Sequence, residues 1–150
     1  MKINPLTDKE CSDFVSRISL GRLGCALDNQ PYVLPIYFAH DGDNIYGLAT
    51  FGQKIEWMRA NPKVCVQVDE IRSEGRWTSV ILNGQYQELP EPEFAEERAR
   101  ARQLLEKRHR WWLNAMGERL MKSSDHLVEP LFFRVKIDSM SGLRAGDDGE

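Results

Sequence analysis

Six short runs with the residue pattern of β-strands are spread along the chain, and they constrain its fold more than any other feature. The runs cover residues 22–27, 32–39, 45–49, 64–68, 77–88 and 131–137. Short polar turns, at 28–30 and 41–43, separate the first three runs. Turns this short join antiparallel neighbours, because a parallel connection needs a crossover of about a dozen or more residues. The first half of the chain is therefore expected to form an antiparallel meander.

Helical segments lie between these runs. A capping box formed by Thr7 and Glu10 predicts the start of a first helix, and a second helix is expected over about 51–61. A third and longest helix is expected from Pro90 onward. Gly84 interrupts the fifth strand run, which is typical of strands that bend at a bulge. This order of elements predicts an α+β fold: a six-stranded, mostly antiparallel split β-barrel with flanking helices.

The size and charge of the chain limit its class. A length of 150 residues favours one domain, and we expect it to cover 1–144, with a flexible polar tail over 145–150. The net charge of −3 argues against nucleic-acid binding, which would need a basic face. No run approaches the roughly 18 apolar residues of a membrane span, and the first residues lack the apolar region of a signal peptide. We therefore expect a cytoplasmic protein without a membrane or nucleic-acid partner.

The cysteines and histidines do not form reactive or metal-binding patterns. They are Cys11, Cys25, Cys65, His40, His109 and His126. The cysteines include no C-x-x-C pair, which favours free thiols in a reducing compartment. The histidines lack the spacing of metal ligands, so no metal is expected. The sequence also lacks a G-x-S-x-G motif. The residue patterns therefore name no catalytic residue.

One junction between a strand and a helix has the features of an anion site. Thr50 and Gln53 have the spacing of a capping box, so Thr50 is the expected N-cap. The first amides of a helix have no partner within it and carry partial positive charge, which suits a phosphate. Gly52 would allow a close approach to the backbone, and Lys54 adds a full positive charge. By itself, the pattern also describes an ordinary capped helix with a surface lysine, and it slightly favours that interpretation.

Two further strand positions are informative. Pro35 lies inside the second run, and because proline cannot donate to a ladder, it indicates an edge, a bulge or a ligand-facing break. Trp77 and Ser79 are two residues apart and therefore share one face of the fifth run. If that face meets the phosphate site, it would border a planar ligand. Otherwise Trp77 is a wall residue of the barrel and Ser79 is a surface hydroxyl.

Segments from nearly the whole chain, taken in order, resemble one protein family. They are residues 21–23, 31–37, 45–54, 61–65, 77–84 and 133–142. Each motif is loose, but the ordered set resembles the pyridoxamine 5′-phosphate oxidase-like FMN-binding split-barrel family. The resemblance is greatest to the small branch that includes nitroimidazole-resistance-type proteins. It implies a homodimer with FMN in two clefts at the interface.

The resemblance also implies roles for individual residues. The backbone of the second run would face the isoalloxazine ring, and the end of the third run would line the ribityl chain and the phosphate. The start of the second helix would bind the phosphate, and the fifth run would approach the flavin edge. In chain order, the implied cofactor-binding residues are Leu34, Pro35, Ile36, Tyr37, Leu48, Ala49, Thr50, Gln53, Lys54, Trp77 and Ser79.

Two departures from the family pattern affect the implied chemistry. Many members of the small branch carry a histidine near the end of the third strand, and here the matching residue is Leu48. The arginine-rich C-terminal substrate motif of pyridoxamine phosphate oxidases is not evident in residues 143–146. The resemblance implies an FMN-dependent oxidoreductase that acts on a small organic substrate. A non-catalytic module that holds a flavin, haem or another planar ligand for storage or sensing stays open, as does a dimeric scaffold without a ligand.

Overall fold

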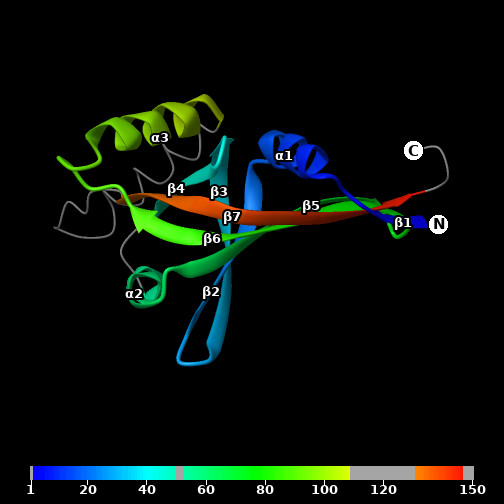
Figure 1. The fold of residues 1–150 in the computed structure, drawn as a ribbon, viewed down its shortest axis with the longest axis horizontal. Coiled ribbons are helices and arrows are strands. Elements are labelled where there is room, and N and C mark those ends of the chain that lie inside the picture. Colours follow the sequence, from blue (N-terminus) through cyan, green and yellow to red (C-terminus); the bar gives the residue numbers. More distant parts are fainter. Residues whose placement is uncertain (1, 50–52, 109–130, 147–150) are drawn as a thin grey trace, which may run out of the picture.

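The computed structural model describes residues 2–49, 53–108 and 131–146 (Figure 1). These residues form seven strands and three helices. The strands are β1 (Lys2–Pro5), β2 (Leu20–Leu27), β3 (Gln30–Asp41), β4 (Asn44–Ala49), β5 (Lys63–Ser73), β6 (Arg76–Glu88) and β7 (Leu131–Gly146). The helices are α1 (Asp8–Arg17), α2 (Gln53–Ala60) and α3 (Ala95–Arg108). The sequence predicted that the third helix starts at Pro90, and in the structure α3 starts five residues later, at Ala95.

Six of the strands form a closed ring. Their order is β7-β4-β3-β2-β5-β6, and β6 pairs back with β7, each pair being antiparallel. The predicted α+β class and mostly antiparallel split-barrel arrangement are confirmed in this form. The six strands of the ring are the six that the sequence predicted, and β1 is a further strand that adds to the edge of β7 beyond the ring. All four residues of β1 are exposed, so they carry no burial pattern that a sequence could display.

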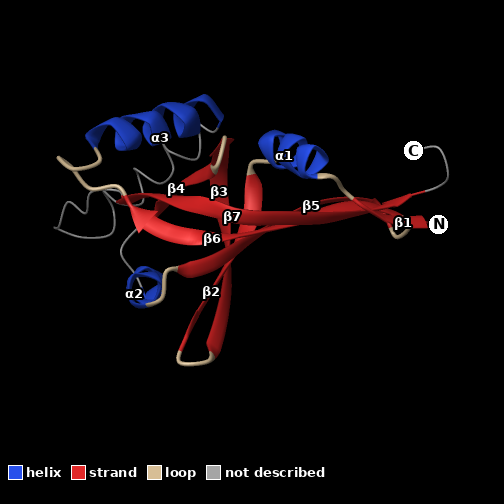
Figure 2. Cartoon of the chain, in the orientation of Figure 1, coloured by secondary structure: helices blue, strands red, loops and turns tan. Residues whose placement is uncertain are grey.

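The main hydrophobic core fills the ring. Alternate residues of β5 and β6 point inward, as the two-residue period of a strand requires, and Val66, Val80 and Leu82 are fully buried there. In the view of Figure 2, α1 and α3 lie on the upper side of the ring, and α2 lies below β6, beside the β2–β3 hairpin that extends further down. Helix α1 contributes Phe14 and Val15 to this core. The ring is therefore a packed interior and not a channel.

A second, smaller core lies outside the ring, beneath α3. Tyr46 and Leu48 of β4 pack there with Leu105 of α3. Figure 1 shows α3 running over β3, β4 and the start of β7. The side chain of Leu48 therefore faces this helix.

The closing seam between β6 and β7 contains a bulge at the predicted position. The pairing register shifts between Asn83 and Gly84, which confirms the bend inferred from the glycine. A Cβ atom at Gly84 would collide with the carbonyl oxygen of Lys136 and approach Cγ1 of Val135 to 2.8 Å. The two backbones can approach this closely only because residue 84 has no side chain.

Strand β7 extends through Ala145 and Gly146, two residues into the segment expected to be a tail. Ala145 is buried and pairs with both Ile3 and Trp77. Residues 147–150 lie outside the described part of the chain. No helix in the described segments is long and apolar enough to span a bilayer.

The predicted capping box at the start of α1 is confirmed. The backbone N–H of Glu10 donates to Oγ1 of Thr7 over 3.2 Å, and the N–H of Thr7 donates to Oε1 of Glu10 over 3.0 Å. Arg144 of β7 also donates to Oε2 of Glu10 over 3.2 Å. The backbone and side-chain hydrogen bonds of Thr7, with Arg144 beside them, hold the pKa of the Glu10 carboxyl below its usual range.

This lowered pKa predicts a pH-dependent effect of Glu10→Gln. Glutamine keeps the hydrogen-bonding shape of a capping box but lacks the charge. Because the folded state lowers the pKa, the charge of Glu10 stabilises the fold above the unfolded pKa, and that contribution is lost as the pH falls through the lower folded pKa. Thermal unfolding at pH 7 should show wild type slightly more stable than Glu10→Gln, with the gap closing toward pH 3. The exposed Asp13→Asn on the same helix is the control, and a gap independent of pH would contradict the assignment.

Candidate functional site

One edge of β3 is open over much of its length. Strand β3 pairs with β2 from Gln30 to Tyr37, but it pairs with β4 only from Phe38 to Asp41. Among the described residues, no strand pairs with the second edge of β3 over 30–37. This open edge begins where the pairing of β3 with β4 ends, at Phe38 and Gly47, and the last two residues of β4 pair only with β7. Over residues 33–36 this side of β3 has no partner strand in the described part of the chain.

Pro35 lies on this open edge in a position that suits proline. The N–H of Phe38 donates to the carbonyl oxygen of Ser19 over 3.0 Å, so residue 38 directs its N–H toward β2. Backbone directions alternate along a strand, so residues 36 and 34 also point to β2, whereas 37, 35 and 33 point to the other edge. Pro35 therefore removes no hydrogen bond from the β2–β3 ladder. Of the three predicted interpretations of this proline, the register supports an edge.

Apart from the hydroxyl of Tyr37, the predicted ligand residues of β3 and β4 have apolar side chains. Leu34 and Ile36 pack toward the interior of the ring, and Tyr37 and Leu48 pack toward the core under α3. Leu48 is only 7% exposed. If these residues bind the cofactor, they do so mainly through their main-chain groups and through the shape of the surface they form.

Helix α2 begins close to the end of β4. Ala49 is the last residue of β4, and Gln53 and Lys54 are the first two residues of α2. Because the connection spans only four peptide steps, the helix start lies within about 14 Å of Ala49. Thr50 and Gly52 lie outside the described residues, so the capping box predicted there stays a prediction. The structure thus gathers β3, the end of β4 and the start of α2.

Helix α2 is fixed to the ring by packing and by an ionic contact. Ile55 and Met58 are each 2% exposed and belong to the main core. Near the end of α2, Arg59 donates to both carboxylate oxygens of Glu88 in β6, over 2.6 and 3.2 Å, and the Tyr86 hydroxyl donates to Oε1 of Glu88 over 3.1 Å. Burial, with the Glu88 carboxylate beside it, raises the pKa of Tyr86 above its usual range. The phenol therefore acts as a hydrogen-bond donor to Glu88.

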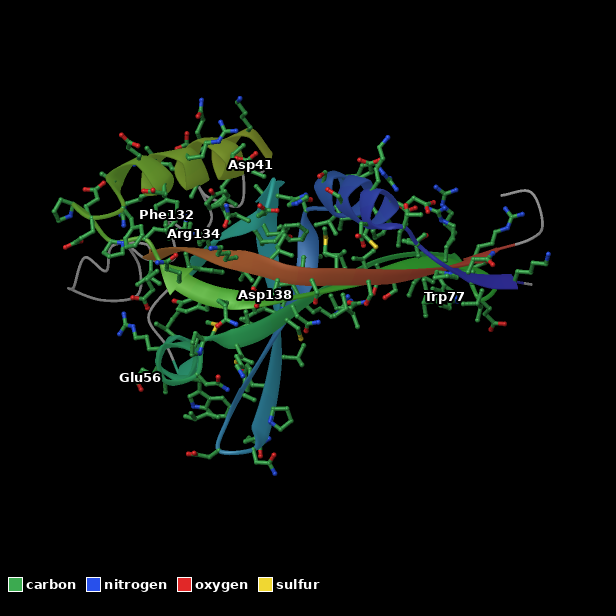
Figure 3. All side chains as sticks on the ribbon, viewed as in Figure 1. Asp41, Glu56, Trp77, Phe132, Arg134 and Asp138 are labelled. Atoms are coloured by element: carbon green, nitrogen blue, oxygen red, sulfur yellow. The ribbon has the colours of Figure 1, made fainter. Side chains whose placement is uncertain are left out.

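Within one chain, Ser79 and Trp77 do not lie beside β3, the end of β4 and the start of α2. Ser79 lies on the side of β6 that faces away from the ring interior, where its Oγ accepts from Nε2 of Gln67 over 3.1 Å. Strands β2 and β5 stand between β3 and β6 in the ring. Figure 3 shows Trp77 at the opposite end of the molecule from Glu56 of α2. The predicted site is therefore divided between two parts of the chain.

The outward-facing side chains of β2, β3, β5, β6 and β7, together with those of β1 beside them, form a surface that we call the outer face. Its centre carries a polar network in which Arg22 pairs with Asp69 over 3.2 Å, and Gln67 bridges Asp69 and Ser79. Exposed apolar side chains surround this network. They are Ile3 (52% exposed), Leu20 (48%), Val33 (65%), Ile71 (70%), Ile81 (44%) and Leu143 (47%). The pairing registers place these side chains on the same side of the strands.

A shallow cleft of about 530 Å³ lies on the outer face between the β2–β3 hairpin and the middle of β6. Pro31, Val33 and Cys65 line it, and Asn83 and Asp138 stand at its polar side. Sequence reasoning missed these residues. These residues come together through the pairing register of β5 and β6, and no local sequence pattern encodes that register. In the described segments, no three potential metal ligands gather in one place.

Comparison with known proteins gives close relatives over the full length. The chain is 41% identical over 155 residues to the uncharacterised protein RA0666 of Rhizobium meliloti (strain 1021), a match that covers 100% of this chain and 99% of that protein. The crystal structure of an FAD-binding protein from Mesorhizobium loti is similar with a TM-score of 0.78 and 38% identity, over 97% of this chain and 100% of that one.

A more distant solved structure shares the fold alone. The FAD-binding protein from Mycobacterium smegmatis has a TM-score of 0.66 and 21% identity, over 95% of this chain and 100% of that one. A family model described as pyridoxamine 5′-phosphate oxidase matches residues 7–144. That match begins at the cap of α1 and ends two residues before the end of β7. The chain therefore belongs to the pyridoxamine 5′-phosphate oxidase family.

Proposed function

We propose that this protein binds a flavin at the open edge of β3 and that this flavin is FMN. The observation that carries the proposal is the edge of β3 over residues 33–36, which no described strand pairs with, beside the end of β4 and the start of α2. A flavin ring carries polar atoms along its edge, and an open strand edge offers hydrogen-bonding partners for them. The Mesorhizobium loti relative, an FAD-binding protein at 38% identity, supports this ligand class.

The phosphate of the ligand is assigned to the first turn of α2. Its free amides and the charge of Lys54 would stabilise a phosphate. FMN and FAD share the ring, the ribityl chain and this first phosphate, so the same anchor suits both. Identification of the bound cofactor by chromatography of the heat-released ligand separates the two, and FMN is the expected result.

When bound, a flavin supplies redox chemistry by accepting and returning electrons. The residues of this chain would bind it, orient its ring and shield one side from water. We infer an oxidoreductase that acts on a small organic substrate. Yet Leu34, Ile36 and Leu48 provide no acid or base beside the open edge, which favours a non-catalytic flavin- or haem-binding module as the second candidate. Anaerobic reduction of the bound flavin by NADH or NADPH supports the enzyme, and no reduction by either donor favours the module.

The same proposal includes a homodimer with the cofactor at its interface. The predicted residues are divided within one chain, because Ser79 is separated from the β3 edge by two strands. A second copy placed against the outer face, whose polar centre is surrounded by exposed apolar side chains, would bring its own Ser79 toward that edge. Two-fold symmetry would then create two equivalent sites. Trp77 stays a prediction for this site.

Lys54→Ala should weaken flavin binding by at least about tenfold, because a charge-assisted hydrogen bond to phosphate contributes about 1.5–3 kcal/mol. The measurement is the dissociation constant of FMN from quenching of its fluorescence by the apoprotein. Lys107→Ala, an exposed lysine on α3, is the matched control and should bind as wild type does. If Lys54→Ala binds FMN as tightly as wild type does, the phosphate is not bound at the start of α2.

A further inference from the structure

An aromatic contact joins α2 to the β2–β3 hairpin. The side chain of Trp57 lies edge-on against that of Tyr32, with the centres of the two aromatic rings 5.9 Å apart and their planes at 73°. Aromatic pairs prefer this separation and this edge-to-face geometry. Figure 1 shows α2 beside the hairpin, which extends beyond the ring of strands. The pair therefore connects α2 directly to β3.

A hydrogen-bonded contact joins the end of α2 to the same part of the hairpin. The backbone N–H of Asn61 donates to the carbonyl oxygen of Trp57 over 2.8 Å, and its side-chain Nδ2 donates to the carbonyl oxygen of Ala26 in β2 over 3.0 Å. Ala26 pairs with Pro31, the residue before Tyr32. The aromatic pair and this hydrogen bond therefore hold α2 at neighbouring positions of the hairpin, which fixes both its distance from β3 and its direction.

The aromatic pair is close in sequence to both parts of the proposed flavin site. Tyr32 directly precedes residues 33–36, where one side of β3 pairs with no described strand. On the helix, Trp57 follows Lys54 by three positions, which is about one helical turn. One contact thus joins a residue next to the proposed edge for the isoalloxazine ring to a residue one turn from the proposed phosphate anchor.

We propose that Trp57 and Asn61 are positioning residues for the flavin, an inference that rests on the proposed flavin site. They set the distance between the start of α2 and the open edge of β3, so that one ligand reaches both, with its phosphate and with its isoalloxazine ring. A ligand that binds at two points gains full affinity only where the protein already holds those points at the matching distance. Both side chains act through the placement of α2, and neither has to contact the flavin.

The test compares FMN with riboflavin, which has the same isoalloxazine ring and ribityl chain but no phosphate. Quenching of flavin fluorescence by the full-length apoprotein gives both dissociation constants. Trp57→Leu should weaken FMN binding by about tenfold, because the phosphate anchor no longer stands at the matching distance. Its affinity for riboflavin should stay within about twofold of that of wild type. Ile55 and Met58 still anchor α2 in the core, so the variant should fold, and its melting curve checks this.

Three further variants separate positioning from general stability. Trp57→Phe keeps an aromatic ring against Tyr32 and should recover most of the FMN affinity. Asn61→Asp loses the donor to Ala26 but keeps an acceptor for the N–H of Lys63, which donates to Oδ1 of Asn61 over 3.3 Å. This variant should also lose affinity for FMN and not for riboflavin. Phe94→Leu, the matched control, removes a half-buried aromatic ring beside the core under α3 and should leave both dissociation constants unchanged.

An unchanged ratio of FMN to riboflavin affinity in both Trp57→Leu and Asn61→Asp would overturn the proposal. So would an equal loss of affinity for the two flavins, because it would show that these residues only stabilise the fold. Absence of FMN binding by the wild-type protein is a different result, seen before any substitution is made. It would overturn the flavin site itself and this inference with it, whereas the first two results leave the flavin site standing.

Discussion

If the proposed homodimer forms across the outer face, replacing Ile81 with arginine should yield monomers and empty the proposed flavin site at the same time. Ile81 lies in the middle of the outer face, on β6, and is 44% exposed in the single chain. In a two-fold dimer the new charge would be buried without a partner, twice per dimer. An uncompensated buried charge costs about 3–5 kcal/mol, which is enough to weaken a dimer by more than about a hundredfold.

The measurement is the molar mass by light scattering during size-exclusion chromatography, with flavin content read from the same peak by absorbance. Gln103→Arg on α3 adds the same charge on an exposed position away from the outer face and should leave both readings unchanged. If the Ile81 variant keeps the dimer mass, the outer face is not the interface. If it becomes monomeric but keeps its flavin, the cofactor does not depend on the second subunit.

Gly84→Ala should lower the free energy of unfolding by about 3 kcal/mol, at the upper end of what overpacking costs. The added methyl group would collide with the carbonyl oxygen of Lys136, and a backbone atom in a paired strand cannot move aside as a flexible side chain can. For a protein of this size that loss corresponds to a fall in melting temperature of roughly 10 °C. Urea unfolding followed by circular dichroism measures it directly.

Gly42→Ala is the matched control for this prediction. Gly42 has a φ of +60°, but a Cβ there would meet no atom within 4 Å. Its replacement should cost only the backbone strain, about 1 kcal/mol. Equal losses at the two glycines would mean that the close approach at the bulge is not what makes Gly84 necessary.

Local patterns predicted the elements of the ring but not its closure. Alternating apolar residues and short polar turns revealed the six ring strands, and the capping box of Thr7 and Glu10 marked the start of α1. Strand β1 was missed because all its residues are exposed and it forms only by pairing with the far end of β7. The pairing of β6 with β7 joins distant segments and depends on register, which no local pattern encodes.

The candidate site was also predictable only in its local features. Pro35 indicated an edge, a bulge or a ligand-facing break, and the structure shows an edge without a partner strand where β4 leaves β3. The direction of Leu48 was not predictable, because it depends on where α3 packs.

Strand β7 has a consequence for how the protein is made. It is the last described element of the chain, yet it pairs with β1, β4 and β6. During synthesis the other strands emerge first, with the edges of β4 and β6 exposed until residues 131–146 leave the ribosome. Unpaired strand edges are sites of aggregation. The ring therefore completes in one late step, and truncation before β7 should yield insoluble chains rather than a smaller folded domain.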